Sequence, residues 1–241
     1  MNTIFTTYFT TSVDPQRPMT WPSNDFSIIE EFYKSVVKHK LNCVILHDNC
    51  SPEFIEQYST DKIKFVKVDE VKLNMVDYRW RLYHNLLEEM TEVKNVYCLD
   101  ISDVVILKNP FKSMKKNMIY IGNEECTNKD NWWMMERYKS INHTEVTGYV
   151  SEFSDKQVLN CGILGGNREM MLDVTEKMAT ILEEANVTKT TVDMVVANAV
   201  VYRHYGESFV SGLPLNTKYR GGAFAFNGED NGADQAWIQH K

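Results

Sequence analysis

Two aspartates follow a short apolar run near the middle of the chain. Residues 96–99 (Val-Tyr-Cys-Leu) are typical of a strand buried on both faces, and Asp100 and Asp103 come directly after it. In an open α/β sheet, ligands bind beyond the carboxyl ends of such strands. Ionised carboxylates at the edge of a core cost folding free energy unless they are paired or bound to a cation. Their oxygens suit Mg²⁺ or Mn²⁺, ions that commonly bridge to nucleotide phosphates. A plainer interpretation, in which Asp100 caps a turn and Asp103 is solvated, is equally consistent with the spacing.

The elements that would position these aspartates alternate between strands and helices. We expect strands at 3–11, 41–46, 63–68, 95–107, 117–122 and 158–168, and helices beginning near 26 and at 52–58, 76–90, 170–185 and 191–202. In the helix at 76–90, the expected buried stripe is Tyr78, Leu82, Leu86 and Met90. The β-α-β-α-β-α-β order with short connections predicts a mainly parallel, doubly wound sheet. We expect 123–157 to be irregular and 221–232 to be a glycine-rich loop.

Length and charge limit the class of protein. At 241 residues the chain fits one large domain or at most two small ones, and 43% hydrophobic residues allow a sizeable core. With 26 basic against 33 acidic residues, the formal charge is −7. This charge argues against a general binder of nucleic acid or anionic membranes, although a small site for one phosphate-bearing ligand remains open. No apolar run approaches the ~20 residues that span a bilayer.

Cysteine usage and the N-terminus favour a reducing compartment. The five cysteines are scattered and contain no CxxC pair, which argues against a disulfide scaffold or a zinc site. The first residues lack the basic and apolar segments of a signal peptide. We therefore expect a soluble, cytoplasmic protein without a membrane span. An ending at His240-Lys241 is also consistent with a chain cut from something longer.

Two segments carry side chains that could contact a ligand. Arg17 is the fixed positive charge of the proline-containing loop at 12–25, and an ordinary surface arginine is an equally good interpretation of it. Trp132 and Trp133 could stack on sugar rings, but large aromatic residues more often fill a small satellite core. We expect at least one of the two to do so.

Later strands and helices add polar residues suited to a site. Asn160 and Gly162 lie in an expected strand, where glycine often marks the close approach of a ligand. Asp193 lies at the start of an expected helix, where the helix dipole favours a carboxylate. It could be a catalytic group or an acid that only caps the helix. The chain has no GxGxxG after its first strand and no GxxxxGK[ST], so dinucleotide-oxidoreductase and P-loop assignments lose their main support.

Taken together, these segments resemble the GT-A glycosyltransferases, which move a sugar from a nucleotide diphosphate to an acceptor. The resemblance spans nearly the whole chain and rests on five segments in order: Thr6-Thr-Tyr-Phe-Thr10, the DxD variant Asp100-Ile-Ser-Asp103, Asn160-Cys-Gly162 with Gly165-Gly166, the Asp193 helix, and His240-Lys241. The small glycosyltransferases of large algal viruses, and related bacterial enzymes, are most similar. The resemblance implies a single GT-A domain with a mixed, mainly parallel sheet flanked by helices. Its nucleotide-binding half would cover about 1–122 and its acceptor and sugar half about 123–241.

The resemblance also implies roles for the matching residues. Those expected at the nucleotide are Thr7, Tyr8, Phe9, Thr10, Arg17, Arg79, Asp100 and Lys241. Those expected around a Mn²⁺ or Mg²⁺ ion are Asp100, Asp103 and His240. Those expected at the sugars are Asn160 and Gly162 for the donor, and Trp132 and Trp133 for the acceptor. Asp193 would be the catalytic carboxylate near the anomeric carbon, either as base or as stabiliser of positive charge.

The implied reaction transfers a sugar from a nucleotide diphosphate, with UDP as the commonest partner of this fold, to a glycan or glycoprotein. It would retain the anomeric configuration, and a viral member would act in the host cytoplasm. Two rival functions remain. One is a nucleotidyltransferase that makes activated sugars, and the other is a carbohydrate-binding module without catalysis.

The chain departs from the family pattern in its acidic motif, because the two aspartates are three apart rather than two. In an extended strand they would point to opposite faces, so both face one ion only if the chain turns at Ile101-Ser102. Otherwise Asp103 is the expected sole ligand and Asp100 the ribose contact. Without the resemblance, Arg79 is consistent with a surface helix salt bridge, and His240 with a frayed terminal histidine.

Overall fold

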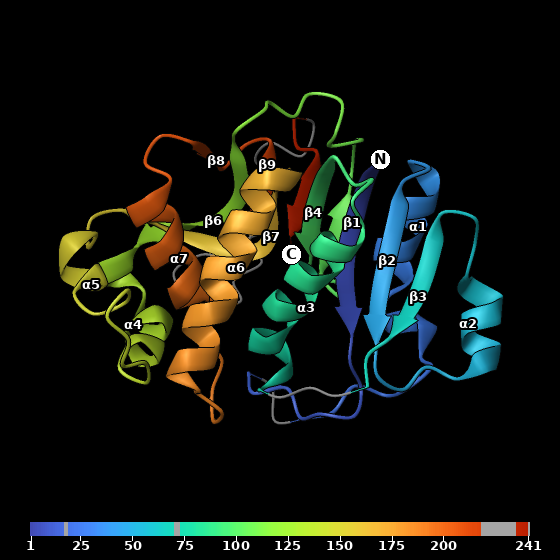
Figure 1. The fold of residues 1–241 in the computed structure, drawn as a ribbon, viewed down its shortest axis with the longest axis horizontal. Helices are drawn as coiled ribbons and strands as arrows, with labels where there is room; N and C mark the ends of the chain where they lie inside the picture. The colour runs from blue at the N-terminus through green and yellow to red at the C-terminus, as the bar shows by residue number, and fades with distance from the viewer. Residues whose placement is uncertain (17–18, 70–72, 218–234, 241) are drawn as a thin grey trace.

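The computed structural model describes residues 1–16, 19–69, 73–217 and 235–240 (Figure 1). Within these residues, a main sheet has seven strands in the order β3-β2-β1-β4-β7-β6-β8, and a second sheet has three in the order β5-β10-β9. The strands are β1 Asn2–Tyr8, β2 Asn42–His47, β3 Ile63–Lys67, β4 Asn95–Leu99, β5 Val104–Ile106, β6 Ile119–Thr127, β7 Gln157–Asn167, β8 Phe209–Ser211, β9 Leu215–Thr217 and β10 Ile238–His240. The helices are η1 Phe26–Ile28, α1 Glu30–Lys38, α2 Pro52–Tyr58, α3 Met75–Glu89, η2 Asn128–Asp130, α4 Trp132–Tyr138, α5 Tyr149–Glu152, α6 Arg168–Ala185 and α7 Asp193–His204.

The strand order reverses between β1 and β4. The chain runs from β1 outward to β2 and β3, and α3 then returns it to β4 on the other side of β1. These four strands are parallel, whereas β7 is antiparallel to both β4 and β6. The expected single α/β domain with a mixed, mostly parallel sheet is thus confirmed. A reversal of this kind leaves a crevice beyond the carboxyl ends of the two central strands.

Both faces of the main sheet are buried. Alternate residues of β1 enter different cores: Phe5 packs in the core with Trp80 and Tyr83 of α3, and Ile4 packs in the core with Phe32 of α1. Helices α3, α6 and α7 cover the first face, and α1 lies on the other (Figure 1). This two-sided burial explains why the central strands read as continuous apolar runs in the sequence.

Several local expectations were wrong. The segment 95–107 is two strands, β4 and β5, that belong to different sheets. The segment 123–157 holds the end of β6 and the helices α4 and α5. Of the stripe expected in α3, Tyr78 is buried, but Leu82, Leu86 and Met90 are only partly buried, and the least exposed apolar side chains are those of Trp80, Tyr83 and Leu87.

Two expectations about the chain as a whole can be compared with the structure. All five cysteines are free thiols. In the described ranges, we find no helix whose length and apolar character would let it cross a bilayer.

Candidate functional site

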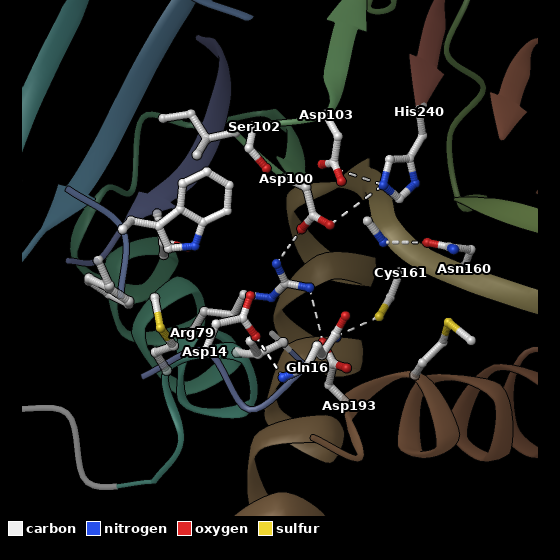
Figure 2. A pocket seen from close by; sticks show the side chains of 18 of the residues that line it. Asp14, Gln16, Arg79, Asp100, Ser102, Asp103, Asn160, Cys161, Asp193 and His240 are labelled. Atoms are coloured by element: carbon white, nitrogen blue, oxygen red, sulfur yellow. Dashed lines mark hydrogen bonds and ion pairs between the residues drawn. The ribbon is translucent and has the colours of Figure 1, made fainter. Parts of the chain in front are cut away.

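Asp100, Asp103 and His240 converge in one pocket (Figure 2). Each offers one ligand atom, and these atoms lie within 4.8 Å of one another. His240 Nε2 is 3.7 Å from a carboxylate oxygen of Asp100 and 3.6 Å from one of Asp103. Two carboxylates and an imidazole are a donor set that fits a divalent cation. The three residues predicted around a metal ion therefore do come together.

The backbone explains this convergence. Strand β4 ends at Leu99, and bends at Ile101 and Ser102 separate the two aspartates before β5 begins at Val104. The turn required for both carboxylates to face one ion is therefore present. His240 arrives from the far end of the sequence because β10 is antiparallel to β5 and pairs it with Val104, next to Asp103. It is 2% exposed, so the interpretation as a frayed terminal histidine was wrong.

Gly162 makes room for the side chains of His240 and Asp100. A Cβ atom placed on it would lie 2.2 Å from His240 Cε1 and 2.8 Å from an Asp100 carboxylate oxygen. Its N–H donates to the side-chain oxygen of Asn160 at 3.0 Å. Glycine is therefore required here by the close approach of the ligands themselves, a more direct reason than the expected contact with a sugar.

The charge around His240 favours a bound cation. Burial alone would lower the pKa of this imidazole, but Asp103 and Asp100 outweigh that effect and raise it. A positive charge is thus favoured between the carboxylates, and a metal ion would take the place of the proton because imidazole binds metals in its neutral form.

Arg79 lies beneath this cluster and joins it to Asp193. Its guanidinium pairs with Asp100 through one nitrogen and with Asp193 through the other, the latter at 3.0 Å (Figure 2). Burial would lower the pKa of Arg79, but the two carboxylates raise it well above its ordinary value. The interpretation of Arg79 as a surface helix salt bridge was wrong, since the side chain is buried and lines the pocket.

Asp193 is held by several donors. One oxygen accepts from Arg79, from Trp80 Nε1 at 3.2 Å and from the Cys161 thiol at 3.5 Å. The other lies 3.2 Å from the Thr191 hydroxyl, whose single hydrogen it shares with the closer Asp77 carboxylate. This network fixes a buried carboxylate at the pocket wall, on the first residue of α7.

Asp77 holds the N-terminus of α7 in place. Its carboxylate accepts from the backbone N–H groups of Val192 and Asp193 at 3.1 and 3.0 Å, and from the Thr191 hydroxyl at 2.6 Å. Burial, followed by the charge of Asp193, raises the pKa of Asp77 to about 7. Because Asp77 and Arg79 both lie on α3, this helix orients Asp193 from two sides.

The pocket extends along the ends of β1, β4 and β7. Its cavity volume is about 190 Å³, and it is partly open to solvent. Thr7, Tyr8 and Phe9 line it as expected. Thr10 is absent from the lining, and its N–H and hydroxyl are bound to Asp48 and Ser23. Its predicted contact with the nucleotide is therefore not supported.

The remaining predicted residues have different positions. Asn160 lines the pocket, and so does the half-buried Trp133. Trp132 is 59% exposed and lies outside the lining, so the two tryptophans do not form one platform. Arg17 and Lys241, both expected at the phosphates, lie outside the described residues, as does the glycine-rich segment 221–232.

Sequence reasoning missed several residues of the pocket wall. Asp14 and Gln16 reach it from the loop after β1 (Figure 2), and Glu124 and Asn131 reach it from β6 and from the N-cap of α4. The last two fall in a segment expected to be irregular. The run Asn131-Trp-Trp-Met134 carries an N-cap signal that would have placed this helix, because Asn131 accepts from Met134 N.

The described lining is strongly acidic. It contains five carboxylates, Asp14, Asp100, Asp103, Glu124 and Asp193, against one arginine and one histidine. The arginine is already paired with two of the acids. A polyanionic ligand would be repelled from these residues unless a cation came with it.

Comparison of the sequence with models of known protein families finds no match, and comparison with curated proteins finds none either. Fold and site together define an α/β protein whose pocket, at the reversal of its central sheet, contains three residues that could hold a metal ion.

Proposed function

We propose that this protein is a metal-dependent glycosyltransferase that uses a nucleotide diphosphate sugar, with UDP as the expected nucleotide, and a glycan or glycoprotein as acceptor. The observation that carries the proposal is the Asp100–Asp103–His240 cluster in a pocket where the strand order reverses. Nucleotide ligands of doubly wound sheets bind at such a position. The GT-A resemblance of the sequence supports the same assignment.

The acidic wall supports the dependence on a metal. Asp100, Asp103 and His240 would hold a divalent cation, which supplies the positive charge that a diphosphate needs as ligand and as leaving group. Arg79 is engaged by Asp100 and Asp193 and so has little capacity to neutralise phosphates itself. Its proposed role is to keep both carboxylates in position.

Asp193 supports the sugar-transfer step of the proposal. Departure of a diphosphate leaves positive charge on the anomeric carbon of the sugar, as in glycoside chemistry generally. Asp193 is a pocket-lining carboxylate fixed by Arg79, Trp80, Cys161 and Thr191, and we assign it to stabilising that charge. The resemblance of the Asn160–Gly162 strand and the Asp193 helix to retaining GT-A enzymes implies transfer with retention of the anomeric configuration, which NMR of the product would test.

The test is a screen of nucleotide sugars with Mn²⁺ that follows release of nucleoside diphosphate. The Asp103→Ala variant should remain folded and lose metal-dependent turnover by at least 100-fold, because one of three ligands is gone. The matched control is Asp61→Ala at an exposed position on the loop before β3. Release of pyrophosphate would instead indicate a nucleotidyltransferase, and wild-type turnover in Asp103→Ala would contradict the proposal.

A further inference from the structure

A second carboxylate centre lies in the same pocket, close to His240 but outside the Asp100–Asp103–His240 cluster. Glu124, on β6, is 5% exposed and lines the pocket together with Asn131 and Asn160. No role was assigned to Glu124 from the sequence, and the metal cluster does not include it. It therefore requires its own explanation.

Two asparagines fix Glu124 in one orientation. Asn131 Nδ2 donates to one carboxylate oxygen at 2.8 Å, and Asn160 Nδ2 donates to the other at 3.1 Å. Each asparagine uses its side-chain oxygen elsewhere: that of Asn131 accepts from Met134 N, and that of Asn160 accepts from Gly162 N. Neither amide can flip without losing a bond at both ends. The orientation of the carboxylate is thus set before any ligand binds.

The chemistry of this centre favours hydroxyl donors. The Cys126 thiol adds a weak hydrogen bond at 3.8 Å, so the side-chain donors recorded for Glu124 are all neutral. A carboxylate has about two acceptor positions on each oxygen, so the oxygen that accepts from Asn160 alone keeps one position for a ligand hydroxyl. Burial raises the pKa of Glu124, and this effect is opposed by its hydrogen bonds to Asn160 and Asn131 and by the charge of His240. Trp133 and Met194 supply apolar surface to the same pocket, and sugar rings bind to such mixed walls.

We infer that Glu124, held by Asn131 and Asn160, forms a subsite that binds hydroxyl groups of a neutral sugar and excludes sugars that carry a carboxylate. The inference rests on the proposed function and specifies its substrate class. Neutral hydroxyls donate to Glu124, whereas a uronate would place a second negative charge beside a buried one. The hydroxyls belong either to the donor sugar or to the acceptor.

The test measures the binding of UDP, UDP-glucose and UDP-glucuronic acid by calorimetry with Mn²⁺. The variants are Glu124→Gln, the control Glu125→Gln at the exposed neighbouring position, and Asn131→Ser. Serine keeps the N-cap of α4 but removes the hydrogen bond to Glu124, so Asn131→Ser tests the same subsite if Glu124→Gln folds poorly.

If the donor sugar binds here, Glu124→Gln should weaken UDP-glucose by at least tenfold and leave UDP unchanged, because a hydrogen bond to a charged group is lost. Wild-type protein should prefer UDP-glucose to UDP-glucuronic acid, and Glu124→Gln should reduce that preference.

If the acceptor binds here, UDP-glucose affinity stays constant, while transfer falls and hydrolysis of the donor by water persists. Either pattern supports the inference. The inference would be overturned if the Glu124→Gln and Asn131→Ser variants both behaved like the Glu125→Gln control in the binding and the transfer assays.

Failure of the proposed function is distinguishable from failure of the subsite. If wild-type protein binds no UDP with Mn²⁺, the transferase assignment fails. A titration with methyl glucoside, followed through the Asn131 side-chain amide signals by NMR, then tests the subsite by itself. A saturable shift that is absent in Glu124→Gln supports the subsite, and the lack of any shift contradicts it.

Discussion

Arg79 separates Asp100 from Asp193 and supplies the counter-charge of the buried Asp193. Removing one partner of a buried ion pair typically costs about 3–5 kcal/mol. We therefore predict that Arg79→Met lowers the free energy of unfolding by about that amount, measured by urea denaturation. The control is Arg81→Met, two residues along α3, whose glutamate partners Glu176 and Glu183 are exposed. An equal loss in the two variants would show that Arg79 has no special role.

Gly162 gives a second test at the scale of one residue. A methyl group there collides with His240 and Asp100, so Gly162→Ala should weaken Mn²⁺ binding by at least tenfold in a calorimetric titration. Gly165→Ala is the matched control on β7, because its Cβ would lie 2.2 Å from the Tyr97 ring. Both variants should unfold at lower temperature, but Gly165→Ala should keep its metal affinity. Unchanged metal affinity in Gly162→Ala would contradict the ligand arrangement.

At the scale of elements, Asp77 connects α3 to the start of α7. Its pKa is about 7 in the folded protein and about 4 in an unfolded chain. Between these values the folded state binds the extra proton, so the contribution of Asp77 to the free energy of unfolding falls as pH rises from about 4 to 7. Asp77→Asn cannot titrate, yet it can still accept from the N-terminus of α7.

We predict that the stability difference between wild type and Asp77→Asn changes by a few kcal/mol across this pH range. Chemical denaturation at intervals from pH 4.5 to 7.5 measures it, with the wild type losing stability relative to the variant as pH rises. Parallel stability curves for the two proteins would show that Asp77 does not titrate there.

The elements that could be predicted from the sequence are those with a long, one-sided or continuous apolar pattern. Strands β1, β2, β3 and β7, and helices α2, α6 and α7, lie within a few residues of their expected bounds. In α3 the pattern misleads, because apolar residues occur on more than one side and only the packing of Trp80, Tyr83 and Leu87 selects the buried face. Strands β8, β9 and β10 have three residues each, too few to show a period.

The site was predictable where residue type and position together implied a role. Asp100 and Asp103 follow an apolar strand, so their role could be predicted from the sequence. Whether the chain turns between them, as it must if both are to face one ion, could be seen only in the structure. The position of His240 depends on the pairing of β10 with β5, which no local pattern encodes. Glu124 was missed because its importance lies in Asn131 and Asn160, which contact it only in the folded chain.

At the scale of the molecule, the proposed metal ligands come from distant parts of the chain. Asp100 follows β4 of the main sheet, and His240 ends β10 of the small sheet. A cation bound by both should stabilise the whole fold. At ~100 times its dissociation constant, a ligand adds ~2.7 kcal/mol to the free energy of unfolding. A rise in melting temperature with Mn²⁺ that is absent in Asp103→Ala would show this coupling, and equal rises in both proteins would contradict it.

The most direct test of the central claim is calorimetric titration of UDP into the wild-type protein, with Mn²⁺ and again with excess chelator. The acidic pocket wall predicts saturable binding at one site with Mn²⁺ and at least a 100-fold loss of affinity without it. Equally tight binding in the two titrations, or no binding of UDP or any other nucleoside diphosphate in either, would contradict the account of a cation that joins a nucleotide to Asp100, Asp103 and His240.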